Sequence, residues 1–321
     1  MSFLAATRRG FDRIALTGGP SVVHKLARVL GQRFEHYAEK IGASMTKSVL
    51  GIIGGSGIYE LAGLEQVVEK RIESPWGEPS APLVCGEIAG LPIVFLPRHD
   101  AGHRLSPSDI NYRVNIDVLK RAGVTDLISL SACGSFREEM PPGTFVLVDQ
   151  FVDRTHRRES SFFGTGCVAH VSMAHPVSPR LRIHLAEAAM AEDIPTVREG
   201  TYVCIEGPQF SSYAESITYK QLGYAVIGMT NMPEAKLARE AEICYATVAM
   251  VTDFDCWHPT MTRSPCKTSF EWCMPMRTRR SASWRGSPAT FRASTNPVRS
   301  ARIARSTRRS SPRRRRATRR S

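Results

Sequence analysis

Short apolar runs alternate with amphipathic stretches through the middle of the chain. Seven β-rich runs predict buried strands: Val49–Ile53, Leu91–Leu96, Asp126–Leu130, Phe145–Val148, Tyr202–Ile205, Ala225–Gly228 and Thr247–Thr252. Apolar residues recur at helical spacing in four stretches: Asp109–Ala122, Arg180–Glu192, Tyr213–Leu222 and Pro233–Ala241. This alternation favours an α/β domain with a largely parallel or mixed central β-sheet flanked by helices.

The chain divides into three segments of different composition. Residues 1–47 form a basic leader, in which residues 22–41 have the spacing of an amphipathic helix, and Met45 is an alternative start directly before the first predicted strand. Residues 48–259 form the folded body. Residues 260–321 are rich in Arg, Ser, Thr and Pro and have almost no apolar periodicity. Such a segment buries too little apolar surface to offset its chain entropy, so we expect it to be disordered.

The net charge of +13 over 321 residues comes from the two ends of the chain. Residues 260–321 hold 18 basic residues and one acidic residue, whereas residues 48–259 hold 17 basic and 26 acidic residues. The body is therefore acidic, which argues against a nucleic-acid-binding domain there. No apolar stretch approaches the roughly 20 residues that span a bilayer. Eight cysteines without a CxxC spacing indicate reduced thiols, so we expect a cytoplasmic protein.

Small and polar residues follow the first three predicted strands. Gly54–Gly57 contains Ser56, a loop that fits either an anion site or a plain turn. Arg98 and His99 follow the second strand, with His103 close behind; an arginine offers a planar fork to phosphate oxygens, although a solvated loop arginine is the alternative. Ser131–Ser135 follows the third strand. Ligands of such sheets bind at the carboxyl ends of strands, so an anion site is expected there.

Two carboxylates follow the last predicted strand, at Asp253 and Asp255. Carboxylates are costly to bury without a function. A metal site is one alternative, but no histidine or third carboxylate lies nearby in sequence, and we expect no metal. Cys133 is a candidate nucleophile, but no histidine partner is placed by sequence, and a small buried residue is the better interpretation.

Several separated motifs of the body, taken together, resemble the trimeric purine nucleoside phosphorylase family. They are GIIGGSGIYE (51–60), PRHDAGHRLSPSDINYRVNI (97–116), SACGSFREEMPPG (131–143), DQFVDRT (149–155), IEGPQFSS (205–212) and MTNMPEAKLAREAEICYATVAMVTDFDCWH (229–258). The match is closest to the branch of the family that acts on 5′-methylthioadenosine. The resemblance implies a single phosphorylase-type domain, a homotrimer without a cofactor, and a role in purine and methionine salvage.

The resemblance also implies the reaction and its residues. Inorganic phosphate, as a co-substrate, cleaves 5′-methylthioadenosine into adenine and 5-methylthioribose 1-phosphate. The phosphate site would comprise Ser56, Arg98, His99, Ser131, Ala132 and Thr230. The nucleoside would contact Met229, Phe210, His103, Ser211 and, from a neighbouring subunit, His170. The adenine would be read by Asp253 and Asp255, one carboxyl group donating a proton to the purine and one accepting from its amine.

Three alternatives to this reading stay open. Asp253 favours 6-aminopurines, since the branches that use 6-oxopurines place Asn there, but a phosphorylase for adenosine, methylthioinosine or a 6-oxopurine nucleoside is the nearest alternative. The second alternative is that the chain is an inactive relative of the family. The Arg-rich tail would bind nucleic acid without specificity by neutralising phosphates, and we expect no specific nucleic-acid partner and no membrane partner.

The resemblance stops after His258-Pro259, where the family continues into a C-terminal helix that closes the methylthio pocket. A chain truncated at Pro259 is therefore expected to keep its phosphate and adenine contacts and to use adenosine and 5′-methylthioadenosine with equal kcat/KM. Initial rates of adenine release from the two nucleosides measure this ratio. Strong selectivity of the truncated chain for the methylthio group would contradict the expectation.

Overall fold

A computed structural model describes residues 49–55, 64–88, 90–100 and 104–259 of the chain. The expected leader helix and the Arg-rich tail lie outside the described residues, as do the candidate site residues Ser56 and His103.

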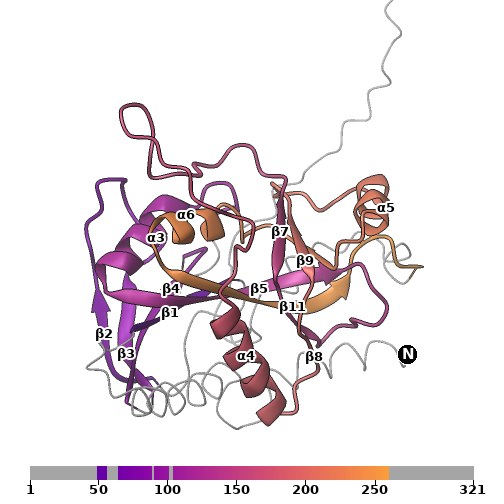
Figure 1. The fold of residues 1–321 in the computed structure, drawn as a ribbon, viewed down its shortest axis with the longest axis horizontal. Helices are drawn as coiled ribbons and strands as arrows, with labels where there is room; N and C mark the ends of the chain where they lie inside the picture. The colour runs from indigo at the N-terminus through magenta and orange to yellow at the C-terminus, as the bar shows by residue number, and fades with distance from the viewer. Residues whose placement is uncertain (1–48, 56–63, 89, 101–103, 260–321) are drawn as a thin grey trace, which may run out of the picture. The chain divides into compact units, whose positions relative to one another are not determined.

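Eleven strands form one mixed sheet (Figure 1). Their bounds are β1 (Val49–Gly54), β2 (Glu65–Lys70), β3 (Leu83–Ile88), β4 (Leu91–Pro97), β5 (Val124–Ser135), β6 (Phe145–Leu147), β7 (Gln150–Asp153), β8 (Thr196–Val197), β9 (Thr201–Cys204), β10 (Val226–Gly228) and β11 (Cys244–Phe254). Strands β4, β1, β5 and β11 are parallel neighbours in that order. Strand β10 pairs antiparallel with the end of β5 and parallel with β9, which in turn pairs with β7.

The described residues contain four helices: α3 (Tyr112–Arg121), α4 (Pro179–Ala191), α5 (Tyr213–Gln221) and α6 (Glu234–Glu240). Side-chain caps fix where the first three begin, since the side chains of Asn111, Ser178 and Ser212 each accept a hydrogen bond from the first turn. Helices α3 and α6 lie side by side on one face of β5 and β11, and α4 lies on the other face (Figure 1). None of the helices in the described ranges has the length and apolar content needed to cross a membrane.

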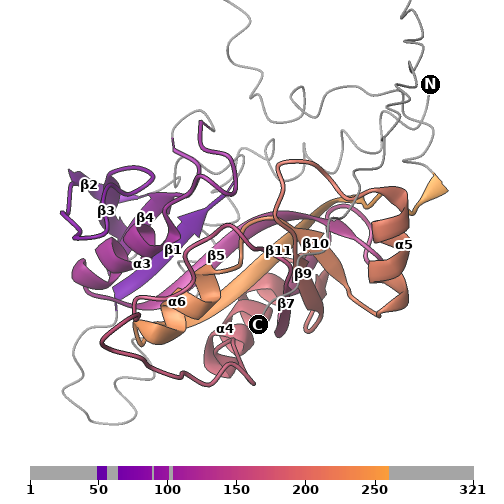
Figure 2. The same cartoon turned by 90° about the horizontal axis from the view of Figure 1, so that it is seen from above.

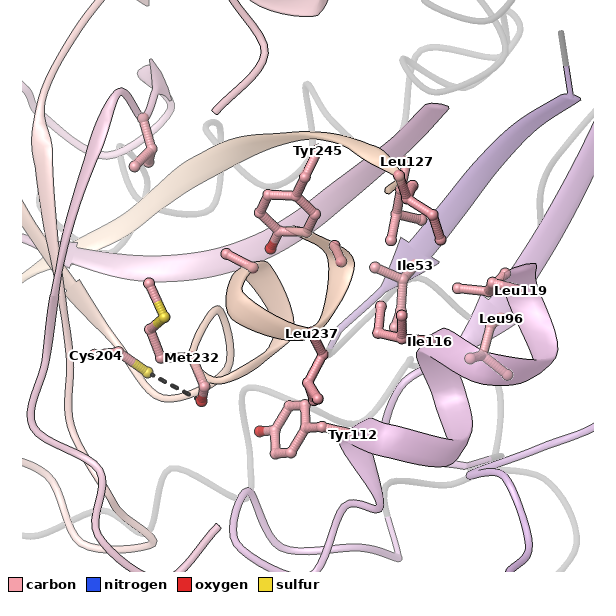
Figure 3. Close-up of a cluster of buried hydrophobic side chains, with 14 of the residues drawn as sticks. Ile53, Leu96, Tyr112, Ile116, Leu119, Leu127, Cys204, Met232, Leu237 and Tyr245 are labelled. Carbon is pink, nitrogen blue, oxygen red and sulfur yellow. Dashed lines mark hydrogen bonds between the residues drawn. The ribbon is translucent and has the colours of Figure 1, made fainter. Parts of the chain in front are cut away.

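The core follows from the two-residue alternation of side chains along the strands. Ile53 and Leu127 point toward α3 and α6, where they join a buried cluster with Ile116 and Leu237 (Figure 3). Ile52 and Ile128, their neighbours on the same strands, belong to a second cluster that packs against α4. The central strands β1, β4, β5 and β11 are therefore covered by apolar side chains on both faces, which explains why these runs show continuous hydrophobicity in sequence.

The predicted fold class, an α/β domain with a mixed sheet and flanking helices, is confirmed. All four predicted helices are present within three residues of their expected ends. Strands β2, β3, β7 and β8 were not predicted; β2 is exposed along its whole length, and β8 has only two residues. Without apolar alternation or length, such strands are recognised only by their pairing partners.

The two central strands are longer than predicted. Strand β5 continues through Ser135, so the prediction that it ends at Leu130 was wrong and Ser131–Ser135 is part of the strand. The reason is tertiary, because β11 pairs with β5 along its length and β10 pairs with its last two residues, which satisfies the backbone of a polar segment. Strand β11 likewise extends from Cys244 to Phe254 and includes Asp253, which was expected after the strand. Figure 2 shows the two long strands running together through the described fold.

Candidate active site

Arg98 lies directly after β4 and is completely buried. Its backbone N–H donates to the Gly54 carbonyl at 2.8 Å, so the ends of β4 and β1 are joined at this point. Its guanidinium donates from Nε and Nη2 to the two carboxylate oxygens of Glu234, at 2.7 and 3.1 Å. Nη2 also donates to Ser129 Oγ at 2.6 Å, and Nη1 donates to the Leu130 carbonyl at 3.1 Å.

These contacts leave one N–H of Arg98 Nη1 for another acceptor. Nη1 lies 3.0 Å from the point where a β-carbon of Gly55 would stand, so a side chain at residue 55 would crowd the guanidinium and force it to shift. Gly55 N–H donates to the Leu130 carbonyl at 3.2 Å, which places this loop against β5. Ser56, the predicted anion ligand, is the next residue but lies outside the described residues.

Glu234 is the charge partner that sequence reasoning missed. It begins α6, and its side chain, like that of Arg98, has no exposed surface. Burial lowers the pKa of Arg98, but the charge and hydrogen bonds of Glu234 raise it above the ordinary value, so the guanidinium stays charged. Glu234 also accepts from the Tyr245 hydroxyl at 2.8 Å. An acidic residue at a helix start is common in sequence, and nothing marked this one as the partner of a residue 136 positions away.

Asn231 extends this buried pair into a network beneath the hydroxyl groups of the site. Its Nδ2 lies within hydrogen-bond distance of Ser129 Oγ, Tyr245 Oη and Thr247 Oγ1, at 3.2, 2.9 and 2.8 Å. Five of these residues, Arg98, Ser129, Asn231, Glu234 and Thr247, have no exposed surface. A network in which almost every donor has an acceptor holds its members in one arrangement.

Ser131 and Thr230, both predicted as phosphate ligands, are brought together. Their hydroxyl oxygens lie 3.1 Å apart, and Ser131 Oγ also lies 3.2 Å from the Tyr202 hydroxyl. The antiparallel pairing of β10 with β5 explains the contact, since Ile227 is opposite Gly134 and the chain after β10 runs back along β5 toward Ser131. Ala132, expected to act through its backbone N–H, is the next residue of β5.

His99 is also buried, directly after Arg98. Its Nδ1 lies 3.0 Å from the Leu105 carbonyl, which can only accept, so Nδ1 carries the proton in this contact. The ring orientation is thereby fixed by the backbone of the following loop. A hydrogen bond between its Nε2 and phosphate stays a prediction.

Asp253 lies near the C-terminal end of β11, where it pairs with Gly134 of β5. Asp255 directly follows β11, and its N–H donates to the Ser135 carbonyl. The pKa of Asp253 is raised to about 6. Burial is the largest cause, the charge of Asp255 also raises the pKa, and a hydrogen bond from the Thr252 hydroxyl lowers it. Asp255 is held differently, because the Ser211 hydroxyl lies 3.0 and 2.8 Å from its two oxygens. Ser211 and Asp255, which were predicted separately, are therefore direct partners.

Three further predicted residues were assigned to the purine, to the sugar and to the site of a neighbouring subunit. Phe210, the expected adenine platform, is 68% exposed. His170, the expected contribution to a neighbouring subunit, is exposed in the stretch between β7 and α4. Met229 lies beside Thr230, and its backbone carbonyl accepts a hydrogen bond from Arg158 at 2.7 Å. Their contacts with substrate stay predictions.

The expectation that the protein needs no metal and no cofactor stays a prediction. Within the described ranges, no three His, Cys, Asp or Glu side chains gather as metal ligands do. Cys133 is buried, and burial and the charge of Asp253 raise the pKa of its thiol well above the ordinary value. A protonated thiol is a poor nucleophile, which supports the interpretation of Cys133 as a small buried residue.

Known proteins are similar to this chain in sequence and in fold. The family model described as the phosphorylase superfamily matches residues 49–283. A relative from Bradyrhizobium diazoefficiens, named S-methyl-5′-thioadenosine phosphorylase, is 86% identical over 215 residues, which cover 67% of this chain and 74% of the relative.

Two solved structures are similar as well. The methylthioadenosine phosphorylase from an antarctic soil metagenomic library is 51% identical, with a TM-score of 0.63 over 67% of this chain and 76% of that one. The methylthioadenosine phosphorylase from Schistosoma mansoni in complex with tubercidin is 39% identical, with a TM-score of 0.64 over 67% of this chain and 84% of that one.

Replacement of Glu234 by glutamine is expected to lower the free energy of unfolding by about 3–5 kcal/mol, because the buried guanidinium of Arg98 would lose its charge partner. Urea denaturation measures the change. The matched control is Asp117→Asn, which breaks the surface pair between Arg121 and Asp117 and should cost only about 0.2–1 kcal/mol. A loss for Glu234→Gln no larger than that of the control would contradict a buried, charged pair.

Proposed function

The chain belongs to the phosphorylase superfamily, and we infer that it catalyses the cleavage of 5′-methylthioadenosine by inorganic phosphate. The products are adenine and 5-methylthioribose 1-phosphate, so the enzyme is a pentosyltransferase. The names of its relatives and their high sequence identity support the reaction. The geometry of the site supports the roles of individual residues.

One observation supports this function most directly: Ser131, a predicted phosphate ligand, and Asp253, a predicted purine ligand, lie on two paired strands. Ser131 belongs to β5, and Gly134, three residues further on, pairs with Asp253 of β11. Three residues of a strand span roughly 10 Å, which is the scale of a nucleoside. A phosphate near Ser131 and a purine near Asp253 would therefore be held at the two ends of one substrate.

The described side chains of Arg98, Ser131 and Thr230 support an anion site at one end of the substrate. We propose that phosphate accepts hydrogen bonds from the remaining N–H of Arg98 Nη1, from the hydroxyls of Ser131 and Thr230, and from the predicted ligands Ser56, His99 and Ala132. Cleavage of the N-glycosidic bond leaves its electron pair on the purine and builds positive charge on the ribose ring. A phosphate oxygen then forms the new bond to the anomeric carbon, and its negative charge stabilises the ring as the old bond breaks. The protein contributes position and electrostatic stabilisation.

The purine end needs one proton donor and one acceptor. Asp253, with a pKa of about 6, holds a proton more readily than an ordinary carboxyl group and is suited to protonate the departing adenine. Asp255 receives the Ser211 hydroxyl, which fixes its carboxylate as an acceptor for the exocyclic amine of adenine. We propose this division of roles, with Phe210 packing against the purine and Met229 and His103 contacting the sugar.

A homotrimer in the cytoplasm, acting in purine and methionine salvage, completes the proposal. In the trimer, His170 would reach the 5′ group of the substrate in a neighbouring subunit. Exposed apolar side chains on the same stretch support an interface there: Phe163 and Val171 are each 37% exposed, and Val168 is 70% exposed.

Adenine release by the purified full-length chain is expected to require inorganic phosphate. A xanthine-oxidase-coupled assay measures adenine from 5′-methylthioadenosine with and without phosphate, and chromatography identifies the sugar phosphate. Sulfate, which resembles phosphate in charge and shape but gives no product, should inhibit in competition with phosphate. An unchanged rate after removal of phosphate would overturn the reaction.

The rate should also follow the protonation of Asp253. With saturating phosphate, kcat/KM for the nucleoside is expected to be full below pH 6 and to fall by about tenfold per pH unit above it, because the proton donor is lost. Asp253→Asn should remove this limb and shift the preference toward 6-oxopurine nucleosides, since an amide donates to their oxygen. Asp117→Asn is the control and should keep the limb. A limb that persists in Asp253→Asn would assign it to another group.

A further inference from the structure

Arg158 is a buried cation in a part of the chain that has no helix or strand. It lies in the long stretch between β7 and α4, which extends away from the sheet in Figure 1. Its side chain is only 1% exposed, whereas its neighbour Arg157 is exposed. Arginine is almost never fully buried unless it is paired, so the partners of this one identify its role.

The partners of Arg158 are mainly backbone carbonyl groups from two segments. Nη1 donates to Met229 at 2.7 Å and to Met232 at 2.6 Å, and Nη2 donates to Glu206 at 2.7 Å and more weakly to Ile205 at 3.4 Å. The first two carbonyls follow β10, and the other two follow β9. One side chain therefore joins the segments that leave two neighbouring strands.

The carboxylate of Glu206 is the charge partner of Arg158, because one of its oxygens lies 3.6 Å from Arg158 Nε, within ion-pair distance but too far for a hydrogen bond. Burial raises the pKa of Glu206, but hydrogen bonds from the Ser108 hydroxyl and the His156 N–H, with the charge of Arg158, bring it below the ordinary value. The carboxylate is therefore charged at neutral pH. It ties the backbone at His156 to the segment that follows β9.

The contact with Met229 orients the peptide unit that leads into Thr230. In a trans peptide unit the C=O and N–H groups point in opposite directions. Because Arg158 holds the Met229 carbonyl, the N–H of Thr230 is directed away from Arg158, and it has no backbone acceptor among the residues that the structure describes. The hydroxyl of the same residue lies 3.1 Å from Ser131 Oγ.

We propose that Arg158 is a positioning residue that fixes the Met229–Thr230 peptide unit, so that the N–H and hydroxyl of Thr230 face the phosphate and Met229 faces the sugar. The proposal rests on the phosphorolysis inferred above and assigns Arg158 a role in phosphate affinity. Arg158 acts through the backbone and does not contact the substrate. Lysine in its place keeps the charge but lacks the planar fork that reaches both segments at once.

The test is the phosphate dependence of Arg158→Lys and Arg158→Gln in the full chain. Both are expected to raise the KM for phosphate by about 10- to 100-fold. The affinity for adenine alone, measured by calorimetry, should change less than threefold because Asp253 and Asp255 are not displaced. Arg157→Gln is the matched control and should keep the wild-type KM. Added guanidinium ion should lower the phosphate KM of Arg158→Gln toward the wild-type value.

The outcomes separate this role from a purely structural one. If wild type releases adenine only with phosphate and Arg158→Lys keeps its phosphate KM, the positioning role is wrong while the reaction stands. Equal losses of adenine and phosphate affinity, or the failure of both variants to fold by circular dichroism, would show that Arg158 only supports the core. If wild type itself needs no phosphate, the proposed function fails first.

Discussion

The buried ion pair between Arg98 and Glu234 is the interaction on which the site depends. Two charges without exposed surface cost several kcal/mol each to take out of water, and this is repaid only when their hydrogen bonds are satisfied. The pair meets that condition through Ser129, Leu130 and Tyr245. It also joins the end of β4 to the start of α6, so it fixes the place where strand ends, loop and helix meet.

The rest of the site follows from how two strands are used. Strand β5 carries the hydroxyl of Ser131 near its middle and Gly134 near its end, and β11 brings Asp253 beside that end. Strand β10 runs antiparallel to β5, which returns Thr230 to Ser131. Ser131 and Asp253 therefore lie on one pair of strands, and the pairing of these strands sets their separation.

The sequence was sufficient for the fold class and for the four helices predicted in the body, and two of its predicted phosphate ligands, Ser131 and Thr230, lie in contact. It was not sufficient for β2 and β8, whose residues carry no strand pattern, or for the length of β5, whose polar end is stabilised by pairing. Glu234 and Arg158 were missed for a related reason. Their partners lie far away in sequence, and a single sequence carries no signal that joins them. Roles assigned by resemblance, such as those of Phe210 and His170, stay predictions.

The most direct measurement is a crystal structure of the full-length chain grown with phosphate and adenine. We expect a phosphate oxygen within hydrogen-bond distance of Arg98 Nη1, with others on the hydroxyls of Ser131 and Thr230, while Glu234 keeps its contacts with the guanidinium. The adenine should lie against Asp253 and Asp255. A phosphate bound elsewhere, or an Arg98 side chain that leaves Glu234 to reach it, would contradict a site built on this buried pair.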